Sequence, residues 1–157
     1  MLPRAYEGQT CSVARTLEVV GDRWTMLVLR DAFLGLRRFD DLQRDLGIAR
    51  NVLSDRLGRL VEDGILERRR YQERPERFEY RLTERGIELW PAVVALMHWG
   101  DKHLAGEAGP PLVLAHKGCG GRVNDRRICE TCGAELNARD VKPVPGPGAD
   151  ARAATAA

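Results

Sequence analysis

Residues 39–60 read FDDLQRDLGIARNVLSDRLGRL, and this stretch decides the fold. Its apolar residues form two groups with the spacing of a helix face: Phe39, Leu42 and Leu46, then Leu53, Leu57 and Leu60. Gly47 separates the groups, because a glycine after the last periodic residue ends a helix. A short support helix, a tight turn over residues 47–49 and a second helix with a polar outer face are typical of a helix-turn-helix.

Helical segments precede this stretch, and a hairpin follows it. Apolar residues at helical spacing predict helices over residues 13–20 and 24–34. Alternating apolar and polar residues then predict strands over residues 65–71 and 78–82, joined by a polar loop that contains Pro75. Short helices followed by a hairpin predict an α+β fold, mostly α, of the winged helix-turn-helix class.

The polar face of the second helix carries side chains suited to reading DNA bases. Outside the leucine stripe, near the N-terminal end of the helix, lie Arg50, Asn51, Ser54, Asp55 and Arg56. Arginine can pair bidentately with guanine and asparagine with adenine, while serine suits a base or a phosphate. We therefore expect this helix to enter the major groove of double-stranded DNA. The alternative is an ordinary solvent-exposed helix face.

Four further arginines flank this helix. Arg74 and Arg77 fall at or near the hairpin tip, where a basic wing can enter a minor groove or grip phosphate. Arg37 and Arg38 precede the support helix and are expected to contact only phosphates. The net charge is only +2, but residues 50–81 hold nine arginines and no lysine against seven acidic residues. Arginine suits phosphate and guanine edges, although a solvated surface of mixed charge explains the same composition.

A long helix is predicted from about Glu84 to Leu104, with Thr83 as its N-cap. Its apolar stripe consists of Ile87, Trp90, Val94, Met97 and Leu104. Such a seam can pair with a second copy, which predicts a homodimer, unless the stripe covers the domain's own core. Pro91 should kink this helix or free one carbonyl. A small-molecule effector between the dimer helices, lined by Trp90, Met97 and Trp99, is a further interpretation, with plain core as its alternative.

A compact segment near the C-terminus carries four soft metal ligands in two close pairs. They are spaced as His116-x2-Cys119-x9-Cys129-x2-Cys132, with glycines beside them. Two pairs separated by a hairpin predict a closed, structural, tetrahedral Zn²⁺ site of the ribbon type. The metal would replace the hydrophobic core that so short a segment cannot build. The alternatives are a ribbon that packs without metal and a redox pair formed by Cys129 and Cys132.

Composition shifts divide the chain into four parts. Residues 1–105 are predicted to form the DNA-binding and dimerisation domain, 106–111 a linker, 112–142 the Cys/His segment and 143–157 a disordered tail rich in Pro, Gly and Ala. No apolar run is long enough to span a membrane and no signal peptide is visible, so we expect a cytoplasmic protein. Enzyme motifs are absent, and His98 and His103 stand five residues apart, so no enzymatic activity is expected.

Short motifs in one fixed order resemble the HxlR family of winged helix-turn-helix regulators over about residues 8–105. They are Cys11-Ser12-Val13, Gly21-Asp22-Arg23-Trp24-Thr25, Arg37-Arg38-Phe39, Leu53-Ser54-Asp55-Arg56-Leu57, Asp63-Gly64, Pro75 with Glu79-Tyr80, and Leu82-Thr83 with Gly86. The resemblance implies a dimer joined through its N-terminal and long C-terminal helices. It also implies two recognition helices on a pseudo-palindromic operator, and repression or activation of nearby genes. Ala49 departs from the family, which often has a serine cap there.

The resemblance also gives a role to Cys11, since some members use a cysteine here as an oxidant sensor, through an intersubunit disulfide or a mixed adduct. A thiolate is favoured at a helix N-terminus or beside an arginine, and Arg15 lies one turn on. The alternative is an inert, partly buried cysteine. Two other functions stay open: a winged-helix protein-interaction module without DNA binding, and a thiol-based redox sensor.

Overall fold

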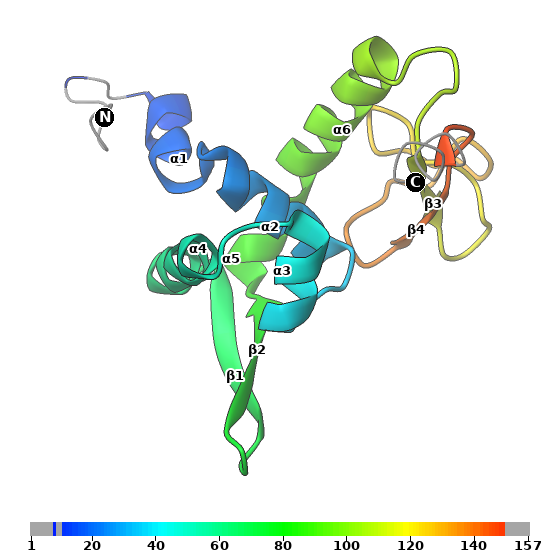
Figure 1. Ribbon diagram of the computed structural model, residues 1–157. Helices are drawn as coiled ribbons and strands as arrows, with labels where there is room; N and C mark the ends of the chain where they lie inside the picture. Colours follow the sequence, from blue (N-terminus) through cyan, green and yellow to red (C-terminus); the bar gives the residue numbers. More distant parts are fainter. Residues whose placement is uncertain (1–7, 9–10, 150–157) are drawn as a thin grey trace. The chain divides into compact units, whose positions relative to one another are not determined.

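The computed structural model describes residue 8 and residues 11–149. The elements are α1 (Ser12–Val20), α2 (Arg23–Phe33), α3 (Phe39–Leu46), α4 (Arg50–Glu62), β1 (Leu66–Gln72), β2 (Arg77–Leu82), α5 (Glu84–Ile87), α6 (Trp90–Leu104), β3 (Leu112–His116) and β4 (Val141–Pro145) (Figure 1). They form two compact units, Met1–Glu88 and Leu89–Ala157, which are taken one at a time below. No helix in the described ranges is both long and apolar enough to cross a bilayer.

The first unit is organised around one leucine-rich core. Leu29, Leu42, Leu53 and Leu57 are almost completely buried, and α2 packs against both α3 and α4. Leu42 comes from α3, and Leu53 and Leu57 come from α4, so each helix buries the face that its spacing predicted. The predicted helix-turn-helix is confirmed.

The turn between α3 and α4 follows from local chemistry. Gly47 adopts the left-handed conformation with φ 60°, which ends α3, and its amide donates to the Gln43 carbonyl at 3.0 Å. Ile48 then buries its side chain, which anchors the turn to the core. Ala49 is the N-cap of α4 and provides no side-chain hydrogen bond. The first amides of α4 therefore lack the usual cap.

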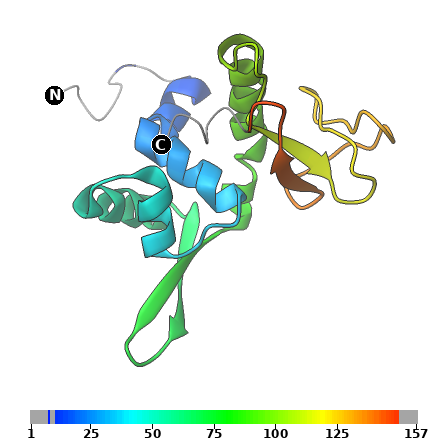
Figure 2. The same ribbon diagram turned by 45° about the vertical axis from the view of Figure 1, so that its right-hand side comes forward.

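The wing is an antiparallel hairpin that projects away from α3 and α4 (Figures 1 and 2). Leu66 pairs with Leu82 at its base, and the register shifts between Arg70 and Gln72 near its tip. The backbone just before α3 adds to β2, because the Tyr80 amide donates to the Arg37 carbonyl at 2.8 Å. The predicted hairpin is thus confirmed and is fastened to the start of the support helix.

The helix predicted from Glu84 to Leu104 is broken into α5 and α6. Thr83 does cap α5, since its Oγ1 accepts from the Gly86 amide at 3.0 Å. The break falls at residues 88–89, just before Pro91, which lies in the first turn of α6. Proline has no N–H and its ring clashes with the preceding turn, so a new helix starts here.

The second unit joins α6 to a small β-structure. Strand β3 pairs with β4 from Leu112↔Pro145 to His116↔Val141, and Val113, Leu114 and Val123 are buried. The predicted tail begins too early at residue 143, since residues 143–145 belong to β4. Backbone pairing explains the difference: beyond the strand, the Gly148 amide donates to the Pro110 carbonyl at 2.9 Å. Residues 150–157 of that tail lie outside the described residues.

Candidate nucleic-acid interface and metal centre

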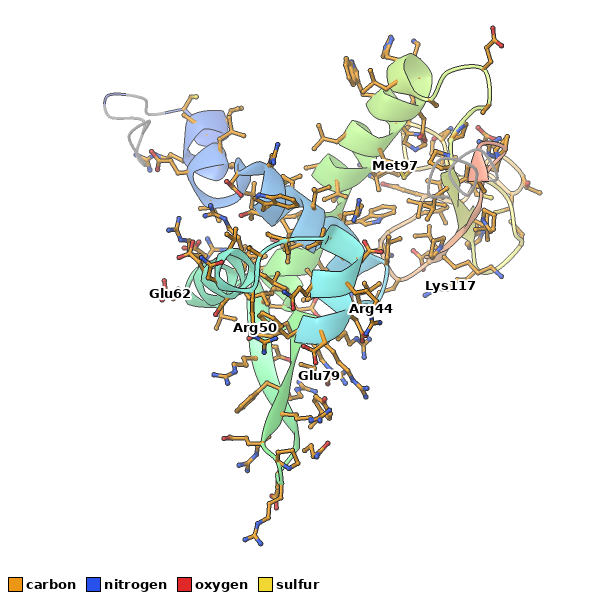
Figure 3. The ribbon with its side chains drawn as sticks, viewed as in Figure 1. Arg44, Arg50, Glu62, Glu79, Met97 and Lys117 are labelled. Atoms are coloured by element: carbon orange, nitrogen blue, oxygen red, sulfur yellow. The ribbon has the colours of Figure 1, made fainter. Side chains whose placement is uncertain are left out.

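The outer face of α4 presents polar side chains opposite its buried leucines. Asn51 and Ser54 are exposed, and neither side chain has a hydrogen-bond or ion-pair partner within the described part of the chain. Arg50 is 72% exposed and lies where α3 and α4 meet (Figure 3). Its guanidinium stacks over Phe39, 4.6 Å from the ring centroid, and its Nη1 stands 3.6 Å from Asp40. Asn51 and Ser54 are therefore available to a ligand, and Arg50 is exposed beside them in contact with α3.

Arg56 differs from its neighbours, because the protein itself occupies its charge. Its side chain is only 19% exposed, and Nε lies 3.2 Å from Oδ1 of Asp22. The same oxygen caps α2 by accepting from the amides of Trp24 and Thr25. Asp55 stands 3.4 Å from Arg56 and 3.2 Å from Arg59. Arg56 thus ties α4 to the start of α2, a contact that the sequence pattern did not show.

The segment before α3 places two arginines beside the wing. Arg37 and Arg38 are both exposed. The Arg38 guanidinium lies over the ring of Tyr71 on β1, 4.8 Å from its centroid, and residue 38 forms a β-bridge with Glu79 on β2. Arg38 is therefore oriented by an aromatic face, and no carboxylate among the described residues forms an ion pair with it.

The wing carries paired and unpaired arginines. Arg74 and Arg77 at the tip are exposed, and within the described ranges neither forms an ion pair. The strand arginines are held in place: Arg68 over Phe78 (3.5 Å), Arg69 by Glu67 (2.6 Å), and Arg70 near Glu73 and Glu76 (3.8 Å each). Residues 68–70 were missing from the predicted site, although three consecutive arginines were a visible signal.

Arg30 links a buried carboxylate of α2 to the support helix α3. Asp31 is 0% exposed, and its Oδ1 accepts from Arg30 Nε at 2.7 Å. Arg30 also donates through Nη2 to Asp45 on α3 at 2.9 Å. The other oxygen of Asp31 is buried without a partner in the described chain. Burial raises the pKa of Asp31 to about 6. No sequence pattern predicted this group.

Cys11 is the N-cap of α1. Its Sγ accepts from the Ala14 amide at 3.4 Å, and the side chain is exposed and free of any disulfide. A sulfur atom at a helix N-terminus faces the positive end of the helix dipole. The thiol therefore has the setting and the access that chemical modification requires.

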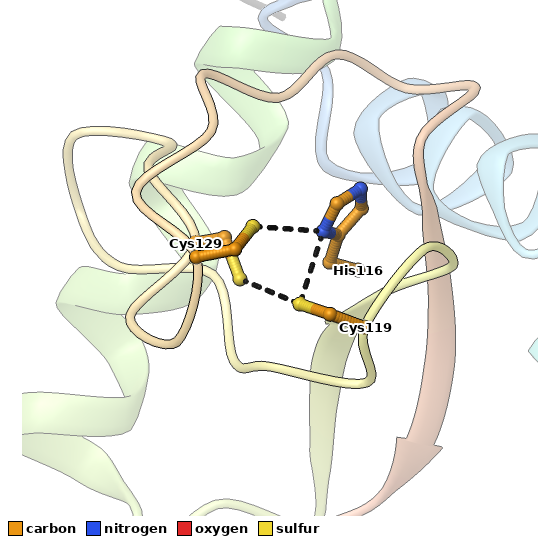
Figure 4. A group of neighbouring side chains, drawn as sticks. His116, Cys119 and Cys129 are labelled. Atoms are coloured by element: carbon orange, nitrogen blue, oxygen red, sulfur yellow. Dashed lines mark hydrogen bonds between the residues drawn. The ribbon is translucent and has the colours of Figure 1, made fainter.

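The four predicted metal ligands do come together in the second unit. Their ligand atoms all lie within 4.8 Å of one another. Cys119 Sγ stands 3.3 Å from Cys129 Sγ, and His116 Nδ1 stands 3.3 Å from Cys119 and 3.4 Å from Cys132 (Figure 4). A tetrahedral zinc with Zn–S bonds of about 2.3 Å would separate its sulfurs by roughly 3.8 Å, so the spacing fits one ion.

Two glycines leave room for this cluster. A Cβ on Gly121 would fall 2.5 Å from Cys129 Sγ, and one on Gly118 would fall 2.9 Å from the His116 ring. Either added carbon would displace a ligand. The backbone N–H of Cys132 also hydrogen-bonds Cys129 and lowers the pKa of its thiol to about 6. The donor set and its surroundings thus suit a thiolate-bound cation.

Two helices expose apolar side chains. On α1, Val13 is 69% and Leu17 44% exposed. On α6, Leu96, Trp99 and Leu104 are between 59% and 73% exposed, whereas Trp90 and Val94 of the predicted seam are buried. The apolar surface that a partner can reach on α6 is therefore shifted from the predicted stripe.

Comparison with known proteins gives consistent matches. The model of the HxlR-like helix-turn-helix family matches residues 19–108. The uncharacterized HTH-type transcriptional regulator Mb3122 of Mycobacterium bovis is 52% identical over 154 residues, covering 98% of this chain and 96% of its own. The solved structure of PA1607 is similar with a TM-score of 0.70 and 38% identity over 86% of this chain and 94% of that one. The redox regulator HypR in its oxidized form is 34% identical over 59% of this chain and 97% of its own, with a TM-score of 0.56.

Proposed function

Because the chain belongs to the HxlR-like helix-turn-helix family of transcriptional regulators, we propose that it acts in the cytoplasm as a homodimer on a pseudo-palindromic operator in double-stranded DNA. One observation carries this proposal. Arg50, Asn51 and Ser54 point outward from α4, opposite the buried Leu53 and Leu57. A helix with that face, set on a rigid support, fits the major groove.

Each polar residue receives a role from its chemistry. Arg50 pairs with guanine, Asn51 with adenine, Ser54 with base or phosphate, and Asp55 accepts from cytosine. Arg37, Arg38, Arg74 and Arg77 contact phosphate, and the wing tip reaches the adjacent minor groove. Arg56 acts through the position of α4, since Asp22 already occupies its guanidinium.

The exposed apolar residues of α1 and α6 form the dimer contact in this proposal. Exposed apolar side chains lie on both helices: Val13 and Leu17 on α1, and Leu96 and Trp99 on α6. Their contact with water is unfavourable. A second copy of the chain would cover them. Sedimentation should give the mass of a dimer, and Trp99→Glu should give that of a monomer. A wild-type monomer at operator-binding concentrations would contradict the dimer.

DNA binding is tested by fluorescence anisotropy with the intergenic DNA upstream of the gene. Affinity should fall steeply with salt, with a log–log slope near −0.9 per phosphate contact. Asn51→Ala should weaken the specific site by about tenfold and leave random DNA unaffected. Arg77→Gln should weaken both equally. Glu62→Gln, at the exposed far end of α4, is the matched control.

Salt-insensitive binding, or equal affinity for the upstream fragment and a shuffled one, would contradict the proposal. No binding to either fragment at low salt would favour the protein-interaction module.

The second unit holds a structural zinc ion in this proposal. His116, Cys119, Cys129 and Cys132 would supply all four ligands, so no coordination position is open for catalysis. Bound zinc would hold the two ligand loops together in place of a hydrophobic core. Metal analysis of reductively purified protein should give about one zinc per chain, and Cys132→Ser should lose most of it. Less than about 0.2 zinc per chain in the wild type would contradict the site.

Cys11 is the second candidate for a regulatory group. Its exposure at the N-cap of α1 and the likeness to the redox regulator HypR support an oxidant response of operator binding. Diamide should change operator affinity in the wild type, and Cys11→Ser should abolish the change. An unchanged diamide response in this variant would contradict a role for Cys11.

A further inference from the structure

The second unit contains a cleft between α6 on one side and strand β3 with the loop that follows it on the other. Its volume is about 290 Å³, near the lower end of small-molecule sites. Met97, His98, Asp101 and Lys102 of α6 form one wall, and Val113 and Arg122 belong to the other. Met97 lies on the side of α6 that faces this β-structure (Figure 3). None of these residues is a predicted DNA contact or metal ligand.

The polar groups of the cleft do not balance one another in charge or in hydrogen bonding. His98 Nε2 is buried and has no hydrogen-bond partner among the described residues. Lys102 and Arg122 bring two positive charges against the single carboxylate of Asp101, and neither cation forms an ion pair within the described chain. The cleft therefore has one excess positive charge and one unsatisfied nitrogen. Buried polar atoms normally have a partner, so an orphaned one at a cleft wall indicates a missing ligand.

Asp101 is half-buried, whereas the two cations of this cleft, Lys102 and Arg122, are exposed. Burial raises the pKa of its carboxyl, while the nearby His98 and Arg122 oppose that rise. The apolar part of the lining comes from Met97, Pro110, Val113, Leu114 and Val123. Each wall thus offers a ligand an apolar side chain and a cation: Met97 with Lys102 on α6, and Val113 with Arg122 opposite.

We propose that this cleft binds a small monoanionic carboxylate with a compact apolar body. The carboxylate would pair with the fork-shaped guanidinium of Arg122 and accept from His98 Nε2, which cancels the excess charge. The apolar body would pack against Met97 and Val113. The volume admits a ring or a short branched chain and excludes long acyl chains. Ligand binding in the cleft does not depend on the proposed function, whereas any effect of the ligand on DNA binding rests on that function.

The helix that forms the cleft has a second, apolar face. Met97, His98, Asp101 and Lys102 follow helical spacing on the cleft side, whereas Leu96, Trp99 and His103 fall on the opposite side. The exposed Leu96 and Trp99 belong to the dimer contact proposed above. A ligand that orders α6 from one side thus acts on the element that would join the two subunits.

The test uses benzoate on the full-length chain, with benzamide as the uncharged isostere and acetate as the anion without an apolar body. Isothermal titration should show benzoate binding at least about tenfold tighter than either analogue. Methyl-labelled methionine gives few signals, because the chain has three methionines. The Met97 signal should shift with benzoate, and the Met26 signal on α2 should not.

Two substitutions locate the binding groups. Arg122→Gln should weaken benzoate about tenfold or more, and His98→Phe should weaken it severalfold while keeping the ring shape. Arg126→Gln changes an exposed arginine outside the cleft lining and should have no effect. Equal metal content in all three variants shows that the Cys/His segment is intact. Equal binding of benzoate and benzamide, a silent Met97 signal, or an equal loss in Arg126→Gln would overturn the proposal.

Operator binding is measured on the same protein, so that failure of the cleft and failure of the proposed function can be told apart. If benzoate binds as predicted and operator binding is absent in every condition, the cleft assignment stands and the regulatory function fails. If operator binding is present and benzoate does not bind, the cleft assignment fails alone.

Discussion

The two units of this chain bring together different kinds of side chain. The first buries a ridge of leucines from three helices, and Leu29, Leu53 and Leu57 have no exposed surface. The Cys/His segment of the second has short strands, tight glycine turns and four clustered ligand atoms. Apolar burial spreads its stabilising free energy over every residue of a buried face. A metal bound by four ligand atoms would concentrate that free energy at one point. The first unit should therefore tolerate chemical treatment that destroys the second.

Removal of the proposed zinc should produce the largest effect. Structural zinc contributes on the order of 10 kcal/mol in zinc-binding peptides. With an excess of chelator, the amide hydrogens of β3 and β4 should exchange rapidly with solvent, while those of α2 and α4 should still exchange slowly. Retained protection of β3 and β4 would mean that this segment packs without metal, and the contrast between the units would disappear.

The reverse experiment removes core volume from the first unit. Leu57→Ala should destabilise this unit by about 2–5 kcal/mol, because the side chain is fully buried. Chemical denaturation followed by circular dichroism measures the loss. Metal content should stay at the wild-type value. Glu62→Ala, at an exposed site on the same helix, is the control and should change stability by less than about 0.5 kcal/mol.

Acidity should act on the first unit through Asp31. Its pKa is about 6 in the folded chain against 3.8 for a free aspartate, so the folded state holds the proton more tightly. Stability should be greater below pH 4 and fall as the pH rises to 6, by on the order of 2 kcal/mol from this group. Asp31→Asn should flatten this dependence in urea unfolding at pH 4.5 and 7. An identical slope in wild type and variant would contradict it.

Restoring the missing helix cap should have the smallest effect. Ala49→Ser should stabilise the first unit by about 1 kcal/mol, because the serine hydroxyl can accept from a free amide at the start of α4. A rise of several degrees in Tm measured by calorimetry checks it. A lower Tm would show that the amides of α4 already have other partners, such as water.

Sequence periodicity predicted the helices and strands that bury one regularly spaced row of apolar side chains. The leucines of α3 and α4 and the alternation of the wing specify burial directly, and the structure has both. The predicted long helix is wrong near Pro91, because the proline starts a new helix instead of kinking the old one or freeing a single carbonyl. The predicted tail failed because β4 is stabilised by pairing with β3, a partner far away in the sequence.

The candidate site was predictable where local spacing carries the chemistry. The four candidate metal ligands follow from two short spacings, and their ligand atoms cluster as expected. The contact of Arg56 with Asp22 joins residues from different helices, so no local pattern could show it. The buried Asp31 and the cleft beside α6 also depend on packing between distant segments. Composition alone assigns such residues to the surface.

The hydrogen bond from Tyr80 to Arg37 fixes more than one strand of the wing. It couples the hairpin to the entrance of the support helix, so the two elements that would touch adjacent grooves form one preassembled frame. Little orientational entropy then remains to be lost on docking. Operator preference could therefore be altered by exchanging the exposed residues of α4 alone, whereas a residue inserted ahead of Arg37 would misalign the whole frame.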